Sequence, residues 1–206
     1  MFIHPKFRLA ERRRKRLQFL DVSLRLERGE RTMKYNVPRL QQFFFEGSLR
    51  GYAGGGEKII VSGVKKTRRF VHQRGELYYR DEYVVNGEYS GGSTIIYVDS
   101  FPVWLMQYYG WCKNDDSAVL AFLKEILADT YRSGEFAGGR GRYGLWSSDD
   151  GTLGYENTPG LSPSLSEFTD FMGHERIYRN PGPGKHLHEG VVFWHRYQGI
   201  LLGEPE

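Results

Sequence analysis

The sequence has a single cysteine, Cys112, and no hydrophobic run approaching the roughly 18 residues of a membrane-spanning helix. One cysteine cannot form an intrachain disulfide, and it excludes a cysteine-rich zinc module. It fits a reducing compartment, so we expect a cytoplasmic protein without a membrane partner. Hydrophobic residues make up 39% and aromatic residues 15% of the chain, which is enough apolar material for a packed core and excludes global disorder.

The main part of the chain also lacks an excess of positive charge, although the formal charge of the 206 residues is +4. Residues 1–32 hold ten of the 29 basic residues and four of the 25 acidic ones, which leaves 19 basic and 21 acidic residues, a charge of −2, for residues 33–206. A body with that charge has no electrostatic reason to bind a phosphate backbone. We therefore expect no nucleic-acid partner for residues 33–206.

The N-terminal extension, residues 1–32, contains the basic run Arg12-Arg13-Arg14-Lys15-Arg16. Such a run is read either as a solvated arm or as a patch for nucleic acid or anionic membranes. Glu27-Arg28-Gly29-Glu30 can be encoded by purine-rich codons that resemble a ribosome-binding site, and Met33 follows closely. We hypothesise that native translation starts at Met33, which leaves residues 33–206 as a single domain.

Four short patterns occur once in each half of this domain, in the same order. They are aromatic-Ala-Gly-Gly (52–55 and 136–139), G-x-L-x-Y-x-(D/N) (75–81 and 151–157), G-x-x-x-I-Y (92–97 and 173–178) and V-aromatic-(L/W)-x-x-Y-x-G (103–110 and 192–199). One match would be weak evidence in a chain rich in Gly and Tyr, but four in unbroken order indicate an internal repeat.

Each repeat unit is predicted to start with a helix and continue with antiparallel strands. Asn36 caps the first expected helix, and Asp116 or Ser117 caps the second, whose apolar residues recur at helical spacing to about Tyr131. Asn86-Gly87 is a hairpin signal, and glycines after both helices fit left-handed C-caps. We expect an α+β fold of two such units, about 38–111 and 118–202, sharing one core. The expected strands are 59–64, 77–83, 94–98, 103–109, 142–147, 168–172 and 191–202.

Several of these stretches resemble a bacterial domain family whose function is not characterised. The resemblance rests on Tyr78–Tyr83, Tyr89–Gly92, Pro102–Gly110, Phe122–Glu125, Phe171–Tyr178 and Val192–Gly199 and covers about residues 38–202. That family occurs alone or behind a Cro/CI-type (XRE) helix-turn-helix in transcriptional regulators. The resemblance implies the fold and a role in sensing, and it supplies no catalytic residues.

Motifs for metal, phosphate or nucleophilic chemistry are weak. His186, His188 and His195 with Glu189 could form a metal cluster, but the sequence has no H-E-x-x-H, and we expect no metal site and no cofactor. The glycine stretches 54–56 and 138–142 match neither a P-loop nor a complete G-x-G-x-x-G, so a phosphate site is less favoured than helix caps. Cys112 follows Trp111 in an apolar run, as a buried cysteine does.

Isolated polar residues on aromatic strand faces are the most informative feature. By period two, Asp81 shares a face with Leu77, Tyr79 and Tyr83, and His195 shares one with Phe193 and Tyr197. A buried carboxylate needs partners or must be neutral. We expect a tyrosine-rich core whose polar atoms satisfy one another, a face that meets solvent, or a cleft at the pseudo-twofold axis. The tentative ligand-binding residues of that cleft are Tyr79, Asp81, Trp104, Tyr108, Asn157, Phe193, His195 and Tyr197.

Three functions fit these observations. The leading hypothesis is a non-catalytic sensor or ligand-binding domain that takes a small aromatic or cationic molecule. The second is an enzyme that uses Asp81 and His195 as acid and base, which requires both groups to reach one substrate atom. The third is a protein-interaction module that presents an exposed apolar patch.

Overall fold

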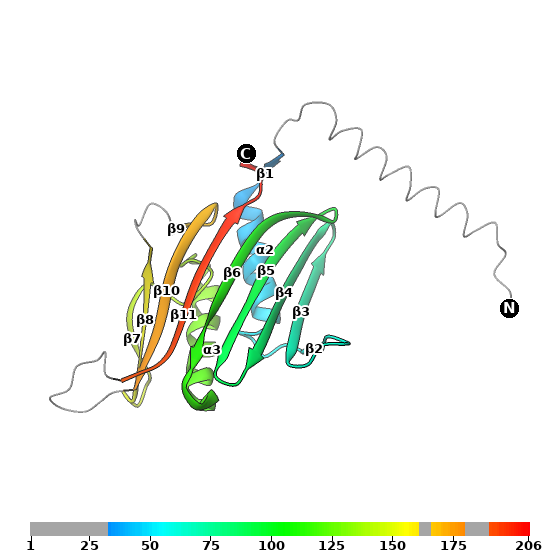
Figure 1. Cartoon of the computed structure of the whole chain (residues 1–206). Coiled ribbons are helices and arrows are strands. Elements are labelled where there is room, and N and C mark those ends of the chain that lie inside the picture. The colour runs from blue at the N-terminus through cyan, green and yellow to red at the C-terminus, as the bar shows by residue number, and fades with distance from the viewer. Residues whose placement is uncertain (1–32, 161–165, 180–189) are drawn as a thin grey trace. The chain divides into compact units, whose positions relative to one another are not determined.

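One antiparallel sheet, covered on one side by two helices, makes up the folded unit Lys34–Glu206 (Figure 1). The structure is a computed structural model and describes residues 33–160, 166–179 and 190–206. The expectations for residues 1–32 and for His186, His188 and Glu189 lie outside the described residues. The sheet strands are β2 (Ile59–Ile60), β3 (Thr67–Arg74), β4 (Leu77–Asn86), β5 (Tyr89–Val98), β6 (Phe101–Cys112), β7 (Gly144–Ser147), β8 (Leu153–Pro159), β9 (Ser166–Glu167), β10 (Asp170–Arg179) and β11 (Val191–Leu201).

The strand order in the sheet is β2-β3-β4-β5-β6-β11-β10-β8-β7, and β9 pairs with the first residues of β10. The chain thus runs from one edge to the centre as β2 to β6, and then from the other edge to the centre as β7 to β11. In the central β6–β11 pair Tyr108 lies opposite Tyr197. A short parallel pair, β1 (Lys34–Tyr35) and β12 (Glu204–Pro205), joins the two ends of the unit.

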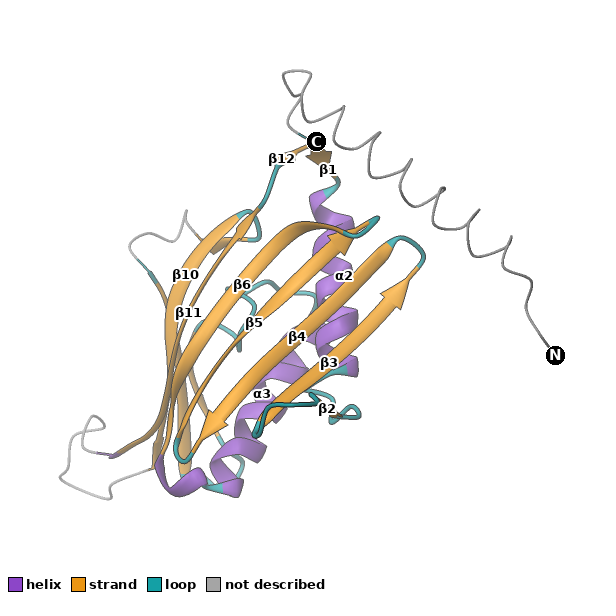
Figure 2. Ribbon diagram, turned by 45° about the vertical axis from the view of Figure 1, so that its right-hand side comes forward, coloured by secondary structure: helices purple, strands orange, loops and turns teal. Residues whose placement is uncertain are grey.

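The two helices lie on the same side of the sheet (Figure 2). Helix α2 (Val37–Arg50) begins at Asn36, whose side chain accepts from the Arg39 amide at 2.9 Å. Helix α3 (Ser117–Ser133) begins at Asp116, whose carboxylate accepts from the Ala118 amide at 2.9 Å, and follows the short 3₁₀ turn η1 (Lys113–Asp115). Both predicted N-caps are therefore confirmed, and each satisfies amides that the helix leaves unpaired.

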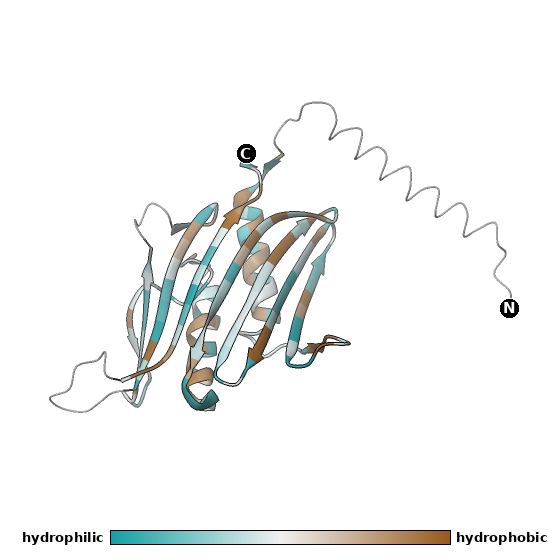
Figure 3. Ribbon diagram, in the orientation of Figure 1, coloured by the Kyte–Doolittle hydropathy of each residue, from teal (hydrophilic) through white to brown (hydrophobic). Residues whose placement is uncertain are grey.

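The apolar core lies between the helices and the sheet. It is rich in aromatic rings: Trp104, buried at 0% exposure, stacks 4.8 Å from Phe168 and 5.6 Å from Phe171, and Phe44 of α2 packs 5.0 Å from Trp104. Hydrophilic and hydrophobic residues alternate along the strands, as expected for a sheet with one covered face (Figure 3).

Neither glycine stretch provides the helix C-cap that was predicted for it. Helix α3 ends at Gly134 with φ of 73°, whereas α2 ends at Gly51 with φ of −100°, so neither cap lies in the stretches 54–56 or 138–142. Gly138 and Gly139 have positive φ, and a Cβ on Gly138 would lie 2.4 Å from the Tyr197 ring. Glycine is needed there because the loop after α3 lies directly on the sheet.

Strand positions were predicted better than strand lengths. The Asn86-Gly87 hairpin is confirmed, with Gly87 at φ of 61°. The expected strand 59–64 is reduced to Ile59–Ile60, and the expected strand 168–172 overlaps β10 only at residues 170–172. Strands β3 and β8 were not among the expected strands. Five of the eight residues of β3 are Arg, His or Gln, so β3 has no clear apolar alternation to indicate a strand.

Candidate functional site

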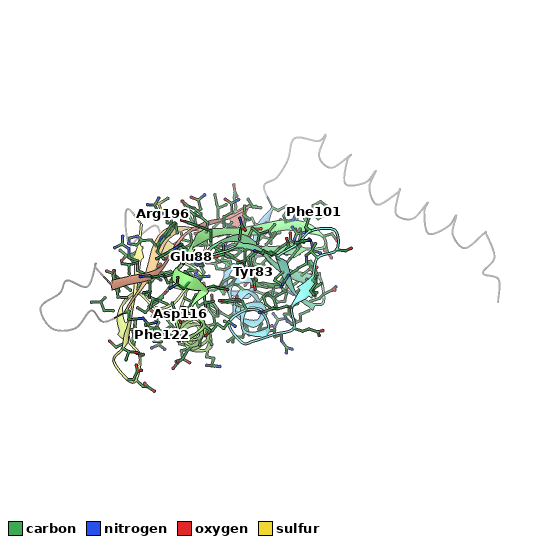
Figure 4. All side chains as sticks on the ribbon, turned by 60° about the horizontal axis from the view of Figure 1, so that its bottom comes forward. Tyr83, Glu88, Phe101, Asp116, Phe122 and Arg196 are labelled. Atoms are coloured by element: carbon green, nitrogen blue, oxygen red, sulfur yellow. The ribbon has the colours of Figure 1, made fainter. Side chains whose placement is uncertain are left out.

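A cavity of about 650 Å³ lies between the sheet and the helices, open at one end. The side chains of Tyr79, Asp81, Tyr83 and Val85 line it in sequence order, so the cavity runs along β4. Its inner end is buried by Phe44 and Tyr131 of the helices, while its mouth includes exposed Gly87 and Asn114. Figure 4 views this end of the molecule, with Tyr83 and Glu88 labelled.

Asp81 is the carboxylate on the floor of this cavity, with 4% exposure. Its Oδ1 accepts hydrogen bonds from the Tyr108 hydroxyl at 2.7 Å and from Thr94 Oγ1 at 2.9 Å. Oδ2 has no hydrogen-bond donor among the described residues. Burial raises the pKa of Asp81 in spite of these bonds and of the Arg140 charge. Of the alternatives left open for this face, the structure shows burial: Asp81 is buried on the same face of β4 as Leu77 and Tyr79.

Aromatic rings from both layers surround the carboxylate. Tyr79 is buried on β4, and its hydroxyl lies 3.4 Å from Ser48 Oγ of α2. Tyr52, after α2, packs edge-on against Tyr83 with ring centroids 5.9 Å apart. Around Asp81, hydroxyl groups and ring faces thus line a largely apolar space, the usual chemistry of a small-molecule site.

Arg140 lines the cavity next to this floor and forms a buried ion pair with Glu175, which does not itself line the cavity. Glu175 of β10 has 0% exposure, and its Oε1 accepts from Arg140 Nε at 2.8 Å and also from Arg140 Nη2. Its Oε2 accepts from the Tyr155 hydroxyl at 2.7 Å. Although burial alone would raise it, the pKa of Glu175 is lowered to about 2 by the Arg140 charge and the hydrogen bonds. The Arg140 guanidinium also lies 5.5 Å from the centre of the Tyr108 ring.

His195 of β11 also lines the cavity, as a neutral imidazole. Burial lowers its pKa below the ordinary 6.5, even though Glu175 acts in the opposite direction. Nδ1 lies 3.2 Å from Arg140 Nη2 and 3.3 Å from Glu175 Oε1, and Nε2 lies 3.3 Å from Ser90 Oγ. In one tautomer Nδ1 accepts from Arg140 and Nε2–H donates to Ser90; in the other Nδ1–H donates to Glu175 and Nε2 accepts from Ser90. Both ring nitrogens are engaged within the protein.

The structure brings five of the eight tentative site residues to one cavity: Tyr79, Asp81, Tyr108, Phe193 and His195. Trp104 is elsewhere, because its indole Nε1 donates to the Phe168 carbonyl at 2.8 Å within the aromatic core. Asn157 and Tyr197 bind each other at 2.7 Å, and Asn157 Nδ2 donates to the Ala137 and Gly141 carbonyls at 3.2 and 2.5 Å. The cavity therefore does not lie at the pseudo-twofold axis, where it was expected. In the second half the loop after α3 occupies the position that corresponds to the cavity of the first half.

Four site residues were missed in the sequence: Thr94, Arg140, Glu175 and Lys124. The alternation that identified Asp81 could have identified Glu175, which lies between Gly173 and Ile177 on a buried face. Arg140 and Lys124 carried no comparable signal, since one was part of a glycine-rich loop and the other a polar residue on an amphipathic helix.

Other chemistry receives little support from the described residues. Within residues 33–160, 166–179 and 190–206, no group of three or more His, Cys, Asp or Glu side chains is arranged to hold a metal. Cys112 is a buried thiol whose pKa burial raises, as expected for a small apolar residue. Neither described helix has the length and apolar character required to cross a bilayer.

Comparisons with protein-family models, with curated proteins and with solved structures found no match for this chain.

Proposed function

We propose that the domain is non-catalytic and binds a small molecule in the cavity between the sheet and the helices, as a sensor domain does. The observation that carries this proposal is the cavity of about 650 Å³ with Asp81 on its floor, a buried carboxylate whose Oδ2 accepts no hydrogen bond from the residues that the structure describes. Small-molecule sites typically have volumes of about 300–1,000 Å³ and combine apolar walls with a few convergent polar groups. The regulator context of the family that the sequence resembles agrees with sensing.

The electrostatics of Asp81 favour a binding role over a structural one. Its pKa is raised, so ionising it costs folding free energy at neutral pH, and an asparagine could accept the same two hydrogen bonds. Residues that reduce stability without an evident structural gain are expected at functional sites. A ligand donor on Oδ2 would offset this cost.

We also propose that the two halves are versions of one unit, which explains why the cavity lies on one side. Asp81 lies opposite Thr94, and Asn157, its counterpart in the repeat pattern, lies opposite Glu175. Tyr108 donates to Asp81 as Tyr197 donates to Asn157. The loop after α3 satisfies Asn157 with its own carbonyls, whereas no described loop reaches Asp81. In this proposal the first half takes a ligand where the second half takes its own chain.

Acid–base catalysis by Asp81 and His195 is less well supported. The two nitrogens of His195 are occupied by Arg140 or Glu175 and by Ser90. Tyr108 lies next to both groups: its hydroxyl donates to Asp81, and its ring centre is 6.0 Å from that of His195. A pair acting on one substrate atom needs direct access to that atom.

The test is a thermal-shift screen of purified protein against a library of small aromatic and polar metabolites. A ligand at about 100 times its Kd stabilises the native state by about 2.7 kcal/mol, which corresponds to about 5–10 °C for a domain of this size. The variant Leu120→Trp places an indole at a residue that lines the cavity, and Ala121→Trp makes the same change at an exposed neighbour. We expect hits that Leu120→Trp abolishes and Ala121→Trp retains. Absence of hits, or equal loss in both variants, would contradict the proposal.

A further inference from the structure

The mouth of the cavity carries a group of basic side chains. Lys58, Lys66 and Arg68 come from the segment between α2 and the start of β3, and Lys124 comes from α3. None of the four forms an ion pair with any residue in the part of the chain that the structure describes. The pKa of Lys124 is lowered by burial and by the neighbouring Lys58 charge. Like charges held together without a counter-ion favour an anion between them.

The acidic residues at the mouth offset only part of this charge: two carboxylates, Glu88 and Asp115, line the cavity together with the four cations. Glu88 accepts hydrogen bonds from Trp111 Nε1 at 2.9 Å and from the Asn114 amide, and it forms no ion pair with a described cation. Arg140, the remaining cation that lines the cavity, is paired with Glu175. The mouth therefore has four cations and two carboxylates, an excess of positive charge, and Asp81 provides an acceptor at the other end of the cavity.

Aromatic rings connect these two ends. The Lys124 ammonium lies 4.9 Å from the centre of the Tyr52 ring, and Tyr52 packs against Tyr83. Tyr83 is two residues from Asp81 on the same face of β4. A planar guest that lies along β4 would contact the rings of Tyr52 and Tyr83, which favour stacked or edge-on contacts.

The length of the guest follows from the register of β3 and β4. The Val85 amide donates to the Lys66 carbonyl at 3.0 Å, which fixes the basic segment beside Val85. Val85 is four residues from Asp81, so at 3.4 Å per residue the mouth lies about 14 Å along the strand from the carboxylate. The guest must reach over a distance on the order of 10–14 Å.

We infer that the ligand is an elongated aromatic phosphate: a phosphate group at the mouth, bound by Lys58, Lys66 and Lys124, and a ring that bears an N–H donor directed at Asp81. Nucleoside monophosphates combine these features and are the probes for the test. This inference rests on the proposed function and specifies its ligand class. Phosphate is preferred over carboxylate because three lysines line the mouth, and a phosphate has three oxygens to share among them.

The experiment is isothermal titration of the full chain with the nucleoside monophosphates, their parent nucleosides and inorganic phosphate. We expect at least one monophosphate to bind, about tenfold or more tighter than its nucleoside, because each charged hydrogen bond contributes about that factor. Its affinity should decrease as the salt concentration increases, and the nucleoside's affinity should not.

Matched variants separate the mouth from the floor. Lys66→Gln removes a cation that lines the cavity, and Lys65→Gln makes the same change at an exposed neighbour that does not. We expect Lys66→Gln and Lys124→Gln to weaken binding of the monophosphate about tenfold and to leave binding of the nucleoside unaffected. Lys65→Gln should change neither affinity. Asp81→Asn should weaken monophosphate and nucleoside alike.

Three results would overturn the ligand class: equal affinity of nucleoside and monophosphate, inorganic phosphate binding as tightly as the monophosphate, or equal effects of Lys65→Gln and Lys66→Gln. Binding of uncharged or cationic library compounds alone would also overturn it, while leaving the proposed function intact. If no compound of either kind binds, both proposals fail.

Discussion

Replacing Arg140 with methionine tests the buried ion pair that this cavity-lining residue forms with Glu175. The change removes the guanidinium and leaves Glu175, at 0% exposure, with Tyr155 as its main donor. Breaking a buried pair by removing one partner typically destabilises a protein by about 3–5 kcal/mol. The pKa of Glu175, lowered from 4.5 to about 2, corresponds to a stabilisation of about 3 kcal/mol at neutral pH, which agrees in size.

The pH dependence gives this prediction a sign as well as a size. A carboxyl whose folded pKa is lowered stabilises the fold above its unfolded pKa, and that stability is lost as pH falls from about 4.5 towards 2. In Arg140→Met, burial without the cation raises the pKa of Glu175 instead. The variant then loses stability as pH rises, so the deficit relative to the wild type should be large at pH 7 and smaller at pH 4.

The assay is urea unfolding followed by tryptophan fluorescence, in a double-mutant cycle with Glu175→Gln. At pH 7 we expect Arg140→Met to reduce the unfolding free energy by about 3–5 kcal/mol, or about 6–20 °C in Tm. Arg140→Met with Glu175→Gln should recover about half or more of that loss, since no unpaired charge remains. If Arg140→Met does not fold, Arg140→Lys replaces it in the cycle. It retains the charge, so its loss of unfolding free energy should be smaller than that expected for Arg140→Met. Strictly additive effects in the cycle, or an equal deficit at pH 4 and pH 7, would refute the reasoning.

Three further predictions concern single positions. Asp81→Asn should raise the Tm at pH 8 and leave it unchanged at pH 3, because the folded pKa of Asp81 is raised and its ionisation therefore costs stability only at higher pH; a lower Tm at pH 8 would contradict this. Gly173→Ala should destabilise by about 2–4 kcal/mol, since its Cβ would lie 2.3 Å from the Tyr197 hydroxyl, whereas Gly154→Ala, with no atom nearer than 3.9 Å, should be close to neutral by the same urea assay. Cys112, the single thiol, should react slowly with a thiol reagent at pH 8 and fast in urea, because burial raises its pKa and restricts access; rapid labelling of the native protein would show the thiol to be accessible.

Short local sequence patterns predicted several elements of the fold. The caps Asn36 and Asp116 and the Asn86-Gly87 turn depend on a few neighbouring residues, so they could be predicted from the sequence. Strand β3 could not, because its pairing with β4 imposes an extended conformation on a largely polar segment. Period two placed Asp81 and His195 on buried faces, since alternation is a property of the strand itself.

The partners of those residues depended on tertiary structure. Arg140 reaches Glu175 only because the loop after α3 lies on the sheet, and no local signal gives the path of that loop. Trp104 and Tyr108 are four residues apart on the same face of β6, yet one is in the aromatic core and the other lines the cavity. The sequence shows which face a side chain takes, but where the cavity ends along that face depends on the helices above it.

The most direct test of ligand binding in the cavity is an NMR titration of protein labelled at the methionine methyl groups. The chain has four methionines, of which Met106 is buried and lines the cavity, while Met172 is 38% exposed and lies away from it. With a ligand from the thermal-shift screen, we predict that the Met106 methyl resonance shifts in a saturable way and that the Met172 resonance stays in place. A saturable shift of Met172 with Met106 unchanged would locate binding elsewhere and contradict the account.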